Sequence, residues 1–107
     1  MPQPNMQQLL KQAQKMQEEM LAAQESLKDE VVEASAGGGM VTVKVTGDLR
    51  VQSITIDPEA VDPEDVELLQ DMVLAATNEA LRSAQELASA KLGGIAGGLG
   101  GLGLPGF

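Results

Sequence analysis

Residues 6–27 read MQQLLKQAQKMQEEMLAAQESL, a run without glycine or proline that consists mainly of strong helix formers. Apolar or small side chains recur in it at alternating intervals of three and four residues: Met6, Leu9, Ala13, Met16, Met20, Ala23 and Leu27. This spacing is that of a heptad seam. Because Asn5 supplies an N-cap side chain directly before the run, we predict a coiled-coil-like helix over residues 5–28.

The segment after this helix changes to a period of two. Three stretches rich in β-branched residues follow one another, and glycine-containing turns separate them: 31–36, 41–46 and 49–56. We predict three antiparallel strands within residues 31–56, joined by plain hairpin turns. The apolar phase slips between Val51 and Ile54, which indicates a β-bulge near residues 52–53.

A second long helix is predicted over residues 62–92. Asp62 and Pro63 resemble an N-cap and a first-turn proline, and apolar residues, many of them alanine, again recur at threes and fours. Gly93 and Gly94 are expected to stop the helix. Residues 93–107 contain eight glycines, so we divide the chain into a domain at 1–92 and a flexible glycine-rich tail at 93–107.

The predicted fold class is therefore α+β: a long N-terminal helix, a three-stranded antiparallel sheet and a long C-terminal helix. About 23 helical residues reach ~35 Å, whereas a seven-residue strand reaches only ~23 Å, so the helices must overhang the sheet. Their overhanging apolar stripes need a cover, either the other helix or a second subunit. Since most soluble oligomers are two-fold homodimers, we predict a homodimer.

Composition excludes several classes of function. The chain has no cysteine and no histidine, and no recognisable base-orienting group, so we expect neither an enzyme nor a metal or cofactor site. Phe107 is its only aromatic residue, which rules out stacking platforms for bases. No basic leader with an apolar run and no stretch of ~20 apolar residues is seen, so we expect a cytoplasmic protein without a membrane partner.

The net charge of −9 argues against a uniformly basic DNA-binding surface, but the charges are unevenly placed. Residues 1–17 carry Lys11 and Lys15 and no acid, and residues 80–107 carry Arg82 and Lys91 against Glu86 alone. If the two helices pack antiparallel, their sheet-distal ends lie together and should gather these four cations. The acidic segment 57–79 would stay nearer the sheet.

Four glutamines surround the two N-terminal lysines: Gln7, Gln8, Gln12 and Gln14. Their amides could donate hydrogen bonds to phosphates or read base edges. The other interpretation of each residue is a solvated face of a coiled-coil-like helix. The candidate DNA-binding set thus comprises these glutamines with Lys11, Lys15, Arg82 and Lys91.

Several segments, taken together and in order, resemble the bacterial YbaB/EbfC nucleoid-associated proteins: LLKQAQKMQ at 9–17, AGGG at 36–39 before alternating valines, IDP at 56–58 and ATNEA at 76–80. The resemblance covers nearly the whole chain. It implies a tweezers-like homodimer that engages duplex DNA with its projecting helices, and a nucleoid-associated location. Lys11 and Lys15 fall within the matching first-helix segment, whereas Arg82 and Lys91 rest on the charge argument.

Two hypotheses of function follow. The first is a homodimer that binds double-stranded DNA, largely through backbone contacts, with a role in compaction or transcription regulation. The alternative is a non-enzymatic adaptor for DNA repair or recombination proteins, which the acidity of the chain favours.

Overall fold

The computed structural model describes residues 5–100, and it begins with the predicted helix. Helix α1 spans Met6–Leu27. The side chain of Asn5 caps it by accepting a hydrogen bond from the backbone N–H of Gln7 at 3.0 Å. Lys28 closes the helix, where its N–H reaches the carbonyls of Glu25 and Ser26. The sequence-based range of 5–28 is therefore confirmed, caps included.

The sheet consists of β1 (Val31–Ala36), β2 (Val41–Thr46) and β3 (Val51–Ile56), antiparallel and in the order β1-β2-β3. The first hairpin turns at Gly37–Gly39, where all three residues have a positive φ that only glycine adopts without strain. In the second hairpin Lys44 faces Ser53 while Val45 faces Val51, which leaves Gln52 as the extra residue. The predicted bulge is confirmed.

The second helix begins later than the sequence pattern suggested. After a 3-10 turn, η1 (Pro58–Ala60), helix α2 spans Val66–Gly100. The carboxylate of Asp62 accepts from the N–H of Glu64 within a turn, whereas that of Asp65 accepts from the N–H of Leu68 at 3.3 Å. The predicted start at Asp62 is therefore wrong, because Asp65 is the residue that caps the first turn.

The predicted end of this helix at Leu92 is also wrong. Gly93 and Gly94 lie inside α2, which continues to Gly100. Each glycine costs a helix only about 1 kcal/mol relative to alanine, so packing can outweigh it. Ile95 lies against α1 near Glu19 and Ala22 and supplies such packing. The division at residue 92 thus does not follow the helix boundary, and residues 101–107 of the predicted tail lie outside the described residues.

The core lies between α2 and the first two strands. Val41, Val43 and Val45 of β2 are completely buried beneath three alanines of α2: Ala76, Ala80 and Ala84. The small alanine side chains allow the helix to approach the sheet closely. Side chains of β1 pack at the margin of the same cluster. β3 contributes no buried side chain to this core.

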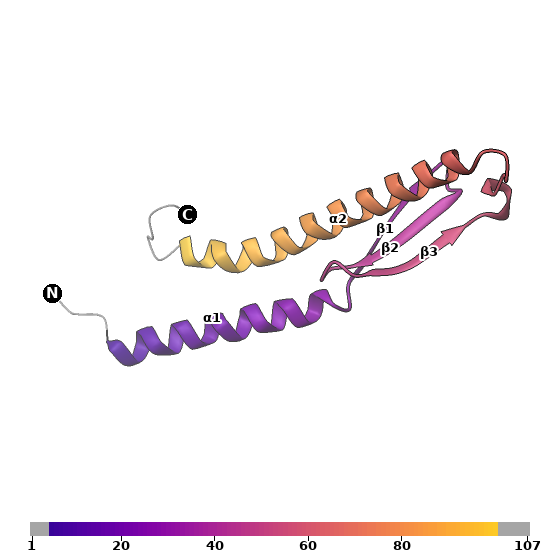
Figure 1. Ribbon diagram of the computed structural model, residues 1–107. Coiled ribbons are helices and arrows are strands. Elements are labelled where there is room, and N and C mark those ends of the chain that lie inside the picture. Colours follow the sequence, from indigo (N-terminus) through magenta and orange to yellow (C-terminus); the bar gives the residue numbers. More distant parts are fainter. Residues whose placement is uncertain (1–4, 101–107) are drawn as a thin grey trace.

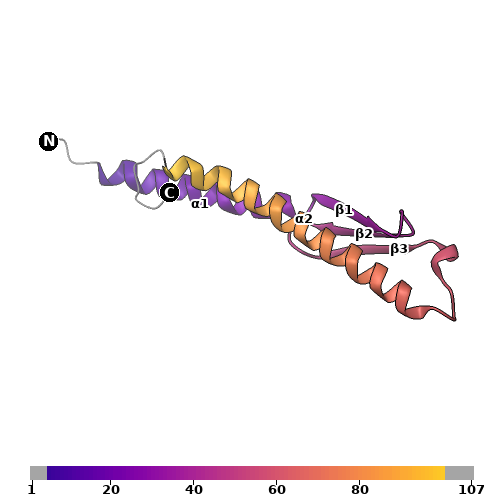
Figure 2. The same cartoon turned by 90° about the horizontal axis from the view of Figure 1, so that it is seen from above.

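The molecule is a long rod. Its principal extents are 76 × 24 × 16 Å and its radius of gyration is 20.7 Å, against about 13 Å for a compact domain of this size. Figures 1 and 2 show the cause: α1 projects away from the sheet, and α2 covers the sheet before running antiparallel beside α1. The helices overhang the sheet, as predicted. No helix among the described residues is long and apolar enough to cross a membrane.

Candidate nucleic-acid interface

The heptad seam of α1 is buried only at the end that meets the sheet. Ala23 and Leu27 are buried and Met16 is half-buried, whereas every residue from Asn5 to Lys15 is exposed. Figure 1 shows this exposed half extending clear of the sheet. The seam therefore serves as a structural brace near the sheet, and its distal half is a free arm in the single chain.

Lys11, Lys15 and the four candidate glutamines all lie on this exposed half of α1. Lys11 and Lys15 are one turn apart and so share one side of the helix, about 6 Å from each other along its axis. Among the described residues, neither ammonium group lies within ion-pair distance of a carboxylate. The structure thus brings these six residues together as one cationic and amide-rich helix surface, which we call the arm surface.

Arg82 lies elsewhere, over the sheet, and it is paired. Its Nε donates to Glu79 Oε2 at 3.2 Å, and its Nη1 donates to Glu86 Oε1 at 2.9 Å. A further hydrogen bond joins Nη2 to the other Glu79 oxygen. This contact with Glu79 lowers the pKa of that carboxyl and raises the pKa of Arg82. The local charge around Arg82 is therefore negative.

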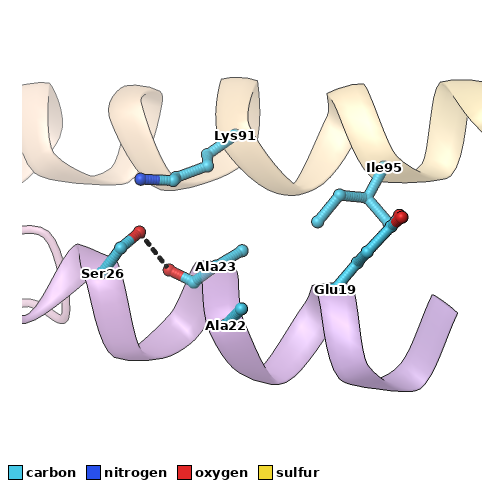
Figure 3. Close-up of a pocket in the computed structure, with 6 residues that line it drawn as sticks. All are labelled: Glu19, Ala22, Ala23, Ser26, Lys91 and Ile95. Carbon is cyan, nitrogen blue, oxygen red and sulfur yellow. Dashed lines mark hydrogen bonds between the residues drawn. The ribbon is translucent and has the colours of Figure 1, made fainter. Parts of the chain in front are cut away.

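Lys91 lies at the junction of the two helices. Its Nζ is 3.3 Å from Glu30 Oε2, just after the end of α1. Figure 3 shows its side chain above Ser26, in a cleft of about 400 Å³ that Glu19, Ala22, Ala23 and Ile95 also line. This contact could not be predicted from local sequence patterns, because Glu30 and Lys91 are far apart in the chain.

The four cations are therefore not gathered within one chain as predicted. At 1.5 Å per residue, Lys15 lies about 16 Å farther along α1 than Ser26, and Arg82 lies about 14 Å back along α2 from Lys91. The reason is that the alanine face of α2 packs against the sheet, and only the last turns of α2 lie beside α1. The sites of Arg82 and Lys91 are separate from the arm surface.

A second uncovered surface is apolar. Val51, Ile54 and Ile56 pair across the sheet with the buried valines of β2 and so share the face that α2 covers, yet all three are exposed. Between β3 and α2 runs a groove of about 430 Å³ with an almost wholly apolar lining: Ile56, Leu69, Gln70, Val73, Leu74 and Thr77. The apolar residues of β3 predict a buried face of this strand. Local pattern does not report that this face remains exposed within a single chain.

This architecture defines a class: an elongated α+β protein that presents a polar helix surface clear of its own sheet. Comparison with known proteins identifies the family. Residues 1–99 match the YbaB/EbfC DNA-binding family, and the chain belongs to it. The expectation from the sequence resemblance is confirmed, and with it the assignment to a DNA-binding rather than an enzymatic class.

Relatives of similar length support the assignment. A nucleoid-associated protein of Acetivibrio thermocellus is 59% identical over 98 residues, covering 92% of this chain and 87% of that protein. One of Saccharopolyspora erythraea is 52% identical over 111 residues, covering 98% and 96%. Among solved structures, an uncharacterized protein of Helicobacter pylori, HP0035, superposes with a TM-score of 0.71 at 26% identity, covering 82% of this chain and 92% of that one.

Proposed function

We propose that this protein is a nucleoid-associated protein that binds duplex DNA as a homodimer through the arm surface. Its contacts are largely to the phosphate backbone, and its role is DNA compaction or transcription regulation in the cytoplasm. The observation that carries the proposal is the arm surface itself. It is an acid-free, unpaired cationic stretch on an otherwise acidic chain, and it projects away from the body.

The net charge of −9 does not oppose this contact, because most of the acids lie outside the arm. The acidic residues that follow β3 and begin α2 lie at the opposite end of the 76 Å rod from the free end of α1. At physiological ionic strength the Debye length is about 8 Å, so these charges are screened from DNA held at the arm. The local field at the arm is set by Lys11 and Lys15, and Glu18 and Glu19, one turn after Lys15, offset part of it.

A second copy of the chain is the best cover for the apolar surface of β3 and α2. Ile56 is 37% exposed and Leu74 is 60% exposed, and they line the groove from β3 and α2 respectively. A two-fold pair buries the same surface on both subunits and closes the assembly. Two arms then project from one dimer, and four lysines face the DNA.

Affinity for duplex DNA as a function of salt tests the proposal. Four neutralised phosphates give a slope of log K against log salt of about −3.6. Lys11→Glu with Lys15→Glu should abolish the mobility shift while the dimer persists. Lys28→Glu with Lys44→Glu makes the same change in net charge on exposed lysines away from the arm and should retain most binding. Equal loss in both variants, or a flat salt response, contradicts the arm assignment.

The alternative function is an adaptor for DNA repair or recombination proteins. One feature favours it: a hollow of about 400 Å³ at the sheet tip, where Met40, Leu68 and Met72 lie among acidic side chains. A basic partner with an apolar anchor would suit this hollow. The Lys11→Glu and Lys15→Glu variant separates the two functions, since an adaptor keeps its protein partner after these changes.

A further inference from the structure

The base of the arm is built as a joint between α1 and the sheet. The N–H of Gly47, in the β2–β3 turn, donates to the carbonyl of Glu30 at 2.8 Å, and the N–H of Glu30 donates to the carbonyl of Leu27 at 3.3 Å. A Cβ on Gly47 would lie 2.6 Å from the Leu27 carbonyl oxygen, so only glycine permits this approach. The last turn of α1 therefore rests directly on the turn of the sheet.

Beyond this joint, α1 is braced loosely against α2. The two helices face each other across the cleft lined by Ala22, Ala23 and Ser26 on one side and Lys91 and Ile95 on the other (Figure 3). Small side chains leave about 400 Å³ of space there. Because few apolar side chains pack between α1 and α2 at this cleft, a polar contact contributes more to fixing the direction of α1 relative to α2.

The Lys91–Glu30 ion pair is that contact. The other ion pairs of the described residues join positions two to four apart in sequence, whereas this pair connects the start of β1 to the end part of α2. Glu30 Oε2 is buried and has no hydrogen-bond partner of good geometry within the described chain. The ammonium of Lys91 is its compensating charge. The two side chains are 31% and 42% exposed, so loss of that charge would leave this one shielded oxygen without its partner while the rest of the carboxylate stays in contact with water.

We propose that Lys91 and Glu30 form a positioning pair that sets the direction of the arm, and that Lys91 does not itself contact DNA. The proposal rests on the proposed DNA-binding role of the arm surface. Lys11 lies about 28 Å along α1 from Glu30, so a change of about 10° at the joint moves it by about 5 Å. That displacement exceeds the ~3.4 Å axial spacing of phosphates on one strand. A misdirected arm must therefore be brought back to its position in each binding event, which weakens binding without removing a lysine–phosphate contact.

A distance measurement within the chain tests the pair without DNA. The chain has no cysteine, so Gln14→Cys on α1 and Gln85→Cys on α2 accept spin labels at those two exposed positions alone. Doubly labelled chain diluted into excess unlabelled protein reports the distance inside one subunit. Lys91→Met and Glu30→Gln should each broaden or shift this distance by several ångströms, and the exchange Glu30→Lys with Lys91→Glu should restore it. Arg82→Met, which breaks local ion pairs on the same helix, should leave it unchanged.

DNA titrations of the Lys91 and Glu30 variants distinguish a positioning role of Lys91 from direct contact with DNA. Lys91→Met should weaken binding several-fold while the slope of log K against log salt stays that of the wild type. If Lys91 neutralised a phosphate, the slope of the dimer would become shallower by about 1.8 units. An unaltered distance distribution in Lys91→Met, or that shallower slope, overturns the proposal. Absence of DNA binding by the wild type would instead overturn the proposed function, and the distance measurement would still decide the role of the pair.

Discussion

Leu49 has a backbone conformation that a leucine rarely adopts. It lies in the β2–β3 turn with φ of 67°, and its side chain is 46% exposed. Its N–H donates to the carbonyl of Thr46, and the N–H of Thr46 donates to the carbonyl of Arg50, so the turn holds Leu49 at its left-handed position. The left-handed region costs a residue with a Cβ about 1–2 kcal/mol, and few contacts of this exposed side chain offset that cost.

Replacement of Leu49 by glycine should therefore stabilise the fold. We expect Leu49→Gly to raise the free energy of unfolding by about 0.5–1 kcal/mol, since relief of the left-handed strain exceeds the extra entropy of glycine in the unfolded chain. Urea unfolding measures the change. Gly47→Ala in the same turn is the opposing control, because its Cβ would collide with Leu27 and should lower stability. A lower midpoint for Leu49→Gly would show that the leucine side chain has a stabilising partner.

Helix α2 carries an acid-dependent contribution to its own stability. The hydrogen bond from Arg82 lowers the pKa of Glu79, so the folded state favours the ionised carboxylate more than the unfolded state does. This contribution is complete above the ordinary glutamate pKa of about 4.3 and is lost as the pH falls through the lowered value. Both side chains are at least half exposed, so salt should screen the effect.

We expect Glu79→Gln to reduce the loss of stability that the wild type shows on acidification from about pH 5 to pH 3. Circular dichroism of urea unfolding across this range, at low salt, measures it. Repetition at about 1 M salt should make the two proteins more alike. An acid response that Glu79→Gln leaves unaltered at low salt would assign the acid dependence to other carboxylates.

The proposed homodimer depends on the apolar surface of β3 and α2. In the single chain Ile54 is exposed, so a charge there costs the fold little, whereas it would be buried without a partner in a dimer built on that surface. We expect Ile54→Asp to shift the protein to monomers in sedimentation experiments and to halve the salt slope of DNA binding. Val61→Asp is the matched control, since Val61 is 55% exposed and lies outside both β3 and α2. A dimer that survives Ile54→Asp would place the interface elsewhere.

Much of this architecture could be predicted from local pattern. The heptad spacing of residues 6–27, the glycine turn at 37–39 and the phase slip at Gln52 each depend on neighbours a few residues away, and the structure agrees with all three. The ion pairs of Arg82 could also be predicted, because Glu79 lies three residues before it and Glu86 four residues after it on the same helix. The arm surface could also be predicted from local pattern, since Lys11 and Lys15 are one helical turn apart in sequence.

What only the tertiary structure decided is where α2 lies along α1 and the sheet. The helix passes through Gly93 and Gly94, and the side chain of Ile95 beyond them faces α1 across the cleft, an arrangement that no local propensity reports. The same placement separates Arg82 and Lys91 from the arm, pairs Lys91 with Glu30 and leaves β3 uncovered. Periodicity fixes which face of an element is apolar, whereas the position of one element along another is set by packing between residues distant in sequence.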